Sequence, residues 1–184
     1  MRRSTGVLSF SLLVGIWSAS NGFRAVLRGV NKAHGYKDER GFIKKTLLCL
    51  MLLLIFTFSL LVMLGFWIFA DALVFVLDPM LQPFFGFFTT AVTWLVLIAA
   101  TTVMYRLACA QGLPLLKIIP GACVTVLLWA LSSEAFSFFV SYYSNIPLIY
   151  GSIAGVFTLV VWLNIIAFIL LLGNTINALI LQKT

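Results

Sequence analysis

The segment FRAVLRGVNKAHGYKDERGFIKK, residues 23–45, carries seven of the chain's twelve basic residues and lies between two apolar runs. Translocation of Lys and Arg is disfavoured, so a basic segment flanked by apolar runs is typical of a cytoplasmic membrane edge. The net charge of +7 could also suit nucleic acid. Because most of this charge sits in one segment, we expect a cytoplasmic loop and no nucleic-acid partner.

The composition excludes a soluble globular domain. Of the 184 residues, 62% are hydrophobic and only 9% are charged. Residues 46–105 carry two acids, Asp71 and Asp78, and residues 118–182 carry only Glu134. Such long uncharged stretches indicate an integral membrane protein.

The apolar runs are long enough to cross a membrane as helices. A hydrocarbon core of about 30 Å takes roughly 20 apolar residues at about 1.5 Å per residue. We therefore predict an all-α, polytopic helical membrane bundle that forms a single domain over residues 1–184, with about five transmembrane spans. The four strong spans are Leu47–Phe69, Phe84–Tyr105, Gly121–Val140 and Ser152–Leu179. A fifth, from Val7 to about Gly22, is short and rich in serine, so it is weak or re-entrant.

The basic residues of the loops alternate along the chain and set its orientation. Residues 24–45 hold seven, 77–83 none, 106–117 two and 142–150 none, and Lys183 follows the last span. This alternation predicts a multi-pass protein whose C-terminus is cytoplasmic.

The N-terminus does not fit this alternation. If residues 7–22 cross the membrane, Arg2 and Arg3 lie outside, against the charge rule. A signal peptide cleaved near Ser18-Ala19-Ser20 is the alternative, but cleavage would leave seven basic residues outside. We expect instead that an earlier span is absent from this chain.

Residues 23–45 are predicted to contain a cytoplasmic basic amphipathic helix and loop. Arg24, Arg28 and Lys32 recur every four positions and share a helical face, and Gly35 is well placed to end the helix. The segment could serve only as an anchor, or it could bind phosphate-bearing head groups or anionic solutes. The candidate binding residues are Arg24, Arg28, Asn31, Lys32 and Arg40.

Polar residues inside the last two spans form a second set of candidates: Glu134, Asn164, Asn174, Thr175 and Asn177. A charged group at this depth is costly, so Glu134 should face the protein interior. It could donate a hydrogen bond to a neighbouring helix or line a proton- or ion-responsive path. Asn164 and Thr175 share a face, and such polar stripes usually serve helix packing, as do the small-residue pairs Gly15/Ala19, Ser18/Gly22 and Gly151/Gly155.

Three stretches resemble the YihY/BrkB family of bacterial inner-membrane proteins: IWSASNGFRAVLRGVNKAHGYKDERGFIKK, PGACVTVLLWALSSEAFSFFV and YGSIAGVFTLVVWLNIIAFILLLGNTINA. The resemblance covers nearly the whole chain and implies a multi-pass protein of the bacterial inner membrane. Its members usually carry six helices, in agreement with an absent leading span. The family has been linked by name to virulence and has carried a ribonuclease label.

The residues give little support to that label. A hydrolytic nuclease needs clustered metal ligands or an acid–base pair, whereas this chain has one His and five widely separated acids. We expect no enzyme activity, no metal and no cofactor. The leading hypothesis is a transporter-like or lipid-handling protein that engages anionic membrane lipids or solutes. The alternative is a non-transporting membrane scaffold linked to envelope integrity, and either could act as an oligomer.

Overall fold

The computed structural model describes residues 2–76, 80, 82–142 and 152–182. Within these residues every regular element is a helix: α1 (Arg2–Ala33), α2 (Phe42–Val76), α3 (Gln82–Ala108), α4 (Leu115–Tyr142) and α6 (Ser152–Gln182). Four of these helices are long and apolar enough to cross a membrane: Phe42–Ala70, Gln82–Ala108, Leu115–Tyr142 and Gly155–Gln182. The prediction of an all-α membrane bundle is confirmed, and the four strong spans lie within α2, α3, α4 and α6.

The first helix differs from the prediction. A separate amphipathic helix was expected after Gly22, but α1 continues without a break from Arg2 to Ala33. It is not among the four helices that could span by apolar length, in agreement with a weak first segment. The basic residues therefore extend the same helix that carries the apolar N-terminal part.

The predicted end of this helix at Gly35 is confirmed. Gly35 has a positive φ of 70°, a conformation that glycine adopts without a steric penalty. Its N–H donates to the Lys32 carbonyl over 3.1 Å, and the Tyr36 N–H donates to the Asn31 carbonyl over 3.0 Å. This pair of bonds is a Schellman motif, and it turns the chain away from α1.

The fourth helix begins earlier than its sequence suggests. Pro120-Gly121 was expected near the helix start, but α4 begins at Leu115 and contains Pro120. A proline inside a helix removes one backbone bond and disturbs its neighbours. Here the Gly121 N–H donates to the Asn177 side-chain oxygen on α6 over 2.8 Å, so the donor next to the proline remains satisfied.

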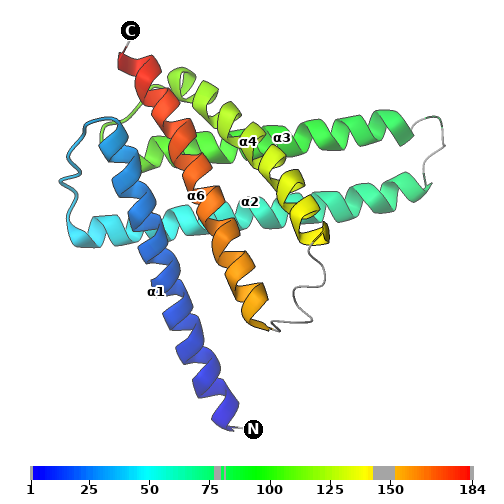
Figure 1. Cartoon of the computed structure of the whole chain (residues 1–184), viewed down its shortest axis with the longest axis horizontal. Coiled ribbons are helices and arrows are strands. Elements are labelled where there is room, and N and C mark those ends of the chain that lie inside the picture. Colours follow the sequence, from blue (N-terminus) through cyan, green and yellow to red (C-terminus); the bar gives the residue numbers. More distant parts are fainter. Residues whose placement is uncertain (1, 77–79, 81, 143–151, 183–184) are drawn as a thin grey trace.

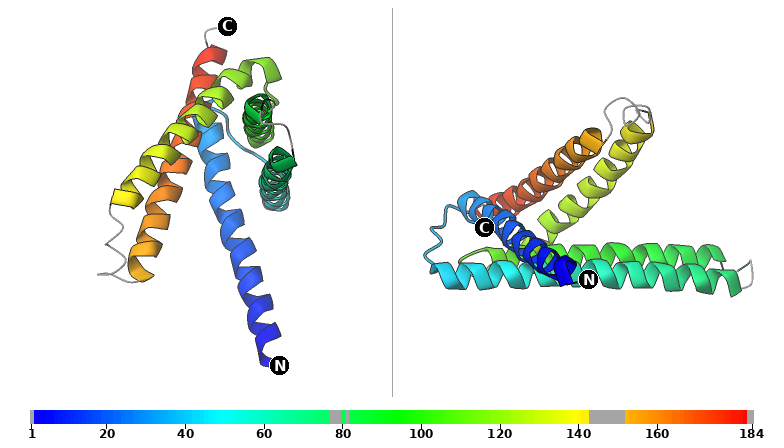
Figure 2. Two further views of the ribbon diagram at one scale, coloured as in Figure 1. Left: turned by 90° about the vertical axis from the view of Figure 1, so that its right-hand side faces the viewer. Right: turned by 90° about the horizontal axis from the view of Figure 1, so that it is seen from below.

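The helices form two hairpins that meet at one end. Figures 1 and 2 show α2 beside α3 and α4 beside α6, with the two pairs diverging from a common end. That end contains residues 34–41 and 109–114 and the end of α6, whereas α1 starts far from it. The buried hydrophobic cluster also lies there and includes Leu27, Val30, Leu52, Tyr105, Ile118 and Leu170. We call this part of the molecule the basic end.

Helices α4 and α6 cross closely where two glycines face each other. A Cβ on Gly173 would overlap the Thr125 hydroxyl and the Gly121 carbonyl, and a Cβ on Gly121 would overlap Asn177. The Tyr105 hydroxyl of α3 donates to the Leu170 carbonyl over 2.6 Å. It also shares a hydrogen bond of 2.7 Å with the Thr125 hydroxyl. Three helices are therefore fixed around this crossing.

The small-residue pairs expected from the sequence do not make this contact. Nothing lies within 4 Å of a Cβ built on Gly15, Gly22 or Gly155. Gly151 lies outside the described residues, as do Asp78, Lys183 and most of the expected outer loop at 142–150. On α1 the glycine that approaches another helix is Gly29, which packs against Leu171 of α6.

Candidate anion-binding site

Basic side chains gather at the basic end. Seven belong to residues 24–45, and Arg106 and Lys117 lie at the end of α3 and the start of α4. The turn at Gly35 brings the start of α2 back beside the last turns of α1. Basic residues from separate parts of the segment therefore face the same space.

That space is a pocket of about 460 Å³ between α1 and the start of α2. We call it the α1–α2 pocket. Five cationic residues and one acid contribute to its lining: Arg24, Arg28, Lys32, Lys37, Lys45 and Asp38. Four of the five predicted binding residues line it: Arg24, Arg28, Asn31 and Lys32. The geometry thus brings together Arg24, Arg28 and Lys32, as their helical spacing predicted.

Arg24 is held firmly at the wall of this pocket. Its Nη2 donates to the Thr46 hydroxyl of α2 over 2.7 Å, and its guanidinium carbon lies 4.6 Å from the centre of the Phe42 ring. Its Nε is buried and has no hydrogen-bond partner among the described residues. The guanidinium is therefore oriented in advance at the wall of the pocket.

Asp38 neutralises only part of the positive charge. Its carboxylate lies 3.5 Å from Lys45 Nζ and 3.9 Å from Arg40 Nε. Lys45 Nζ also donates to the Asp38 backbone carbonyl over 2.9 Å. Arg28 and Lys32 are exposed on α1 and make no ion pair within the described chain. An anion entering the pocket would meet these unpaired charges first.

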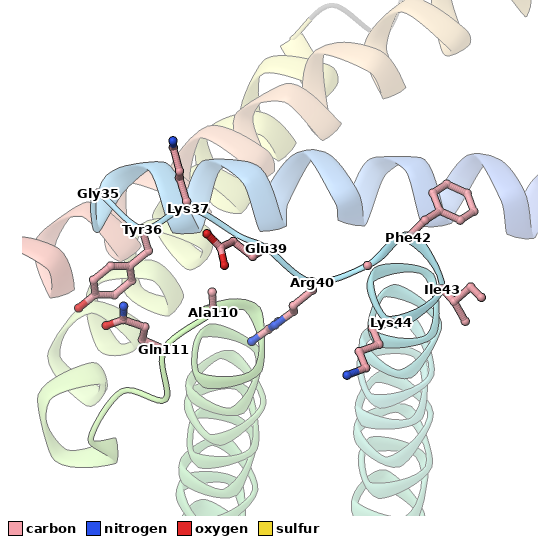
Figure 3. A pocket seen from close by; sticks show the side chains of 11 residues that line it. Gly35, Tyr36, Lys37, Glu39, Arg40, Phe42, Ile43, Lys44, Ala110 and Gln111 are labelled. Carbon is pink, nitrogen blue, oxygen red and sulfur yellow. The ribbon is translucent and has the colours of Figure 1, made fainter.

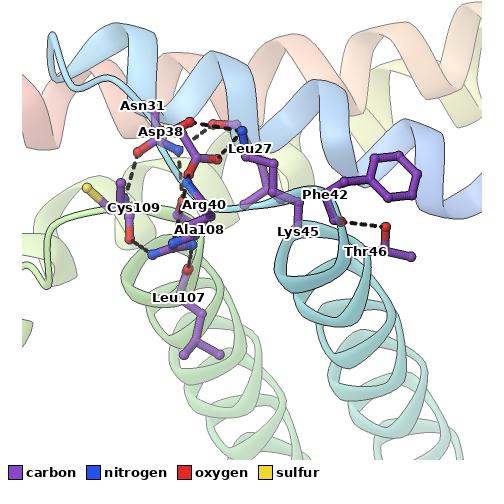
Figure 4. A network of polar contacts seen from close by, with 11 residues as sticks. Leu27, Asn31, Asp38, Arg40, Phe42, Lys45, Thr46, Leu107, Ala108 and Cys109 are labelled. Carbon is purple, nitrogen blue, oxygen red and sulfur yellow. Dashed lines mark hydrogen bonds and ion pairs between the residues drawn. The ribbon is translucent and has the colours of Figure 1, made fainter.

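Two predicted binding residues, Asn31 and Arg40, form hydrogen bonds with the end of α3 (Figure 4). The Asn31 amide donates to the Ala108 carbonyl over 2.9 Å and accepts from the Ala110 N–H over 2.7 Å. Arg40 donates to the carbonyls of Leu107 and Cys109 over 3.1 and 2.6 Å. The last carbonyls of a helix lack intrahelical partners, so these side chains cap α3.

A wider opening lies on the other side of residues 35–44. Its volume is about 1160 Å³, and Figure 3 shows Tyr36, Glu39, Lys44 and Gln111 around it. Its lining has three cationic residues, Lys37, Arg40 and Lys44, and one acid, Glu39, so it has fewer cations for each acid than the α1–α2 pocket. The His34 ring stacks on Tyr36 with 5.9 Å between centroids, and no role was predicted for it. The opening has a weaker electrostatic preference for anions than the α1–α2 pocket.

The polar residues of the spans fall into two groups. Asn174 and Asn177 are fully buried: Asn174 donates to the Val30 carbonyl over 3.3 Å, and Asn177 accepts from Gly121. These two asparagines join α6 to α1 and α4, as expected of packing residues. Asn164 and Thr175 are exposed and donate to carbonyls of their own helix, those of Val160 and Leu171.

The expectation that Glu134 faces the interior is wrong, because this residue is exposed on α4. The helix packs on α6 through another side, where Phe136 stacks on Trp162 with 4.6 Å between ring centroids. Residues two apart on a helix point about 200° from each other. Glu134 is therefore directed away from α6.

Sequence reasoning missed four residues of the α1–α2 pocket region: Lys37, Asp38, Lys45 and the Arg24 partner Thr46. Their proximity to α1 depends on the path of residues 34–41. The Schellman turn at Gly35 was the available signal, since it reverses the chain next to the basic face.

Comparisons with known proteins agree with this architecture. The family model described as virulence factor BrkB matches residues 1–184. The ribonuclease-like protein YfkH of Bacillus subtilis (strain 168) is 32% identical over 191 residues, covering 98% of this chain and 68% of that protein. No solved structure matches the chain. The match over all 184 residues shows that this helical membrane protein belongs to the virulence factor BrkB family.

Proposed function

We propose that the chain is a lipid-handling membrane protein that binds the phosphate-bearing head groups of anionic lipids in the α1–α2 pocket. The observation that carries the proposal is the lining of this pocket, in which five cations surround one partly paired carboxylate. An anionic lipid carries both a negatively charged head group, which suits this lining, and acyl chains, which keep the molecule in the membrane.

Arg24 is the expected centre of recognition. A guanidinium presents several N–H donors in a plane and suits phosphate oxygens better than a single ammonium does. Thr46 and Phe42 fix the plane of Arg24, so little side-chain entropy is lost on binding. Arg28 and Lys32 add long-range attraction of roughly 1 kcal/mol each near an anionic surface, less at high salt.

A lipid is favoured over an ionic solute by the opening between the two hairpins. This opening, of about 370 Å³, is lined mainly by apolar and aromatic residues, with Thr93 and Ser133 as its hydroxyl-bearing members. Such a lining offers few groups that could replace the water around an ion. It suits acyl chains, which need no hydrogen bonds.

We further propose that the basic end faces the cytoplasm and that the membrane is the bacterial inner membrane. The charge rule for loops supports this orientation, because residues 34–41, the end of α3, the start of α4 and the end of α6 all lie at one end. Arg106 belongs to the last turn of α3 and Lys117 to the start of α4.

We do not extend the ribonuclease-like name of YfkH to this chain. Hydrolysis needs an acid–base pair or a metal site with converging ligands. Asp38 is engaged with Lys45 and Arg40, while Glu134 lies within the span α4. In the described part of the chain, no three His, Cys, Asp or Glu residues lie close enough to hold a metal. This arrangement supports a non-enzymatic role.

Native mass spectrometry tests the proposal. The full chain is purified from membranes and incubated with mixed micelles that contain phosphatidylglycerol and phosphatidylcholine. We expect retention of phosphatidylglycerol, and a loss of at least tenfold in the variant Arg24→Gln/Arg28→Gln/Lys32→Gln.

The control variant is Arg106→Gln/Lys117→Gln, which removes basic charge at the same end but outside the pocket. It should retain the lipid. Equal loss in both variants would indicate nonspecific attraction, and a wild-type chain that retains no anionic lipid would refute the proposal.

A further inference from the structure

One long face of α6 has no partner within the described chain. Its members are exposed and recur at steps of three, four and seven: Phe157, Val161, Asn164, Phe168, Thr175 and Leu179. The opposite side of α6 carries Trp162, Gly173 and Asn177, which contact α4. We call the exposed set the outer face of α6.

Asn164 distinguishes this face from an ordinary lipid-facing surface. It lies twelve residues after Ser152 and eighteen before Gln182, within the span Gly155–Gln182. At about 1.5 Å per residue, it is roughly 18 Å from one helix end and 27 Å from the other. The side chain therefore lies deep in the hydrocarbon region.

The amide of Asn164 is incompletely satisfied there. It can make up to four hydrogen bonds, and among the described residues it makes one, to the Val160 carbonyl over 3.0 Å. Lipid tails offer neither donors nor acceptors, so unpaired amide groups are costly at this depth. A partner that provides both kinds of group would remove this cost.

We propose that the outer face of α6 is the contact surface for a second copy of this chain, with α6 packed against α6 around a two-fold axis along the membrane normal. Two copies inserted in the same orientation place each residue at the same depth. Asn164 then meets its own equivalent, and each amide can donate to the other and accept from it. An unrelated helix would need a polar group at this same depth.

The neighbouring side chains fit such a contact. Val161 and Phe168 lie one turn on either side of Asn164, at the three-and-four spacing that left-handed helix packing uses in membranes.

Association in lipid tests the proposal directly. The full chain is reconstituted at low density in phosphatidylcholine vesicles, and the fraction of paired copies is measured by energy transfer between two dyes. Loss of the two interhelical hydrogen bonds predicts about a tenfold weaker dimer for Asn164→Leu. Leu163→Ala is the matched control: this neighbouring residue is exposed but points about 100° away.

Cross-linking locates the interface independently of that variant. Cysteines introduced as Val161→Cys and Phe168→Cys should form disulfide-linked dimers on mild oxidation, whereas Leu163→Cys should not. The unsubstituted chain supplies the background from Cys49, Cys109 and Cys123. A monomer at all densities, an equal effect of Leu163→Ala, or preferential cross-linking at position 163 would each overturn the proposal. The pocket variant Arg24→Gln/Arg28→Gln/Lys32→Gln should still pair, because this contact does not depend on head-group binding.

Discussion

The crossing of α4 and α6 gives the sharpest quantitative prediction. In Gly173→Ala, the new methyl group meets the Thr125 hydroxyl and the Gly121 carbonyl at less than van der Waals distance. Neither atom can move freely, since the Thr125 hydroxyl donates to the Gly121 carbonyl over 2.8 Å and its oxygen lies only 2.7 Å from the Tyr105 hydroxyl. The two helices must therefore separate.

The expected cost combines two opposing effects. Alanine is more favourable than glycine in a helix by up to about 1 kcal/mol. Overpacking in a close contact costs about 1–3 kcal/mol, and loss of the hydrogen bonds of Tyr105 adds about 1 kcal/mol each. We predict that Gly173→Ala lowers the free energy of unfolding by about 2–4 kcal/mol.

Gly155→Ala is the matched control on the same helix. A Cβ at Gly155 meets nothing within 4 Å, so this variant should be neutral or more stable by up to about 1 kcal/mol. Both are compared with the unsubstituted protein by reversible unfolding in detergent and SDS. Thr125→Ala combined with Gly173→Ala should recover part of the loss, because it removes one of the two overlapping atoms. Equal stability of Gly173→Ala and Gly155→Ala would refute the assigned crossing.

Two substitutions and one labelling experiment test the basic end. In the same SDS titration, Asn31→Leu should lower the free energy of unfolding by about 2–4 kcal/mol, because the Ala108 carbonyl and the Ala110 N–H lose their partner. The control Lys32→Leu, at the exposed neighbouring position, should have little effect. Tyr105→Phe should lower the free energy of unfolding by only about 1–2 kcal/mol in that assay, since the Thr125 hydroxyl still donates to Gly121. A decrease of more than about 4 kcal/mol would show that the Tyr105 hydroxyl has another role. Burial raises the pKa of the Cys109 thiol above its ordinary value of 9.0. In the folded protein at pH 9, Cys109 should therefore react slowly with iodoacetamide, which needs the thiolate. Because the Cys109 thiol ionises more readily in the unfolded state, the free energy of unfolding should fall as the pH rises above 9. Rapid labelling of Cys109 in the native protein would contradict its burial.

Hydropathy predicted the spans because each apolar run exceeds the length that a helix needs to cross the membrane. It could not predict which side of a span faces the protein. Leu131 and Phe138 are as apolar as the buried Ile118 and Ala122, yet they are exposed. In a soluble protein the exposed side would be polar, but lipid removes that signal. The direction of Glu134 was wrong for a different reason: it was derived from the cost of a charge in the membrane, and the residue is nevertheless exposed on α4.

The close crossing was missed for a different reason. Pairs of small residues four apart are frequent in apolar helices, so Gly15/Ala19 and Ser18/Gly22 looked as suitable as any others. The observed contact joins Gly121 of α4 to Gly173 of α6, which are far apart in sequence. Local spacing within one helix carries no information about which helix it will meet.

The pocket was partly predictable, because Arg24, Arg28 and Lys32 need only helical periodicity to share a face. Lys45 joins them through the fold of residues 34–41. The roles of Asn31 and Arg40 were not predictable from charge or polarity. Both lie in the basic segment, but the structure uses their hydrogen bonds to cap α3.

The divergence of the two hairpins follows from where polar bonds can form. At the basic end, near the level of lipid head groups, Asn31 and Arg40 hold α1 and the following loop against the end of α3. Deeper in the membrane, lipid tails are as apolar as the side chains, so burial of leucine or phenylalanine gives helices little reason to associate. Contacts there need close packing or a polar group that lipid cannot satisfy. Asn164 is such a group on an open face, so the same physical rule that separates the hairpins also favours pairing of two copies through α6.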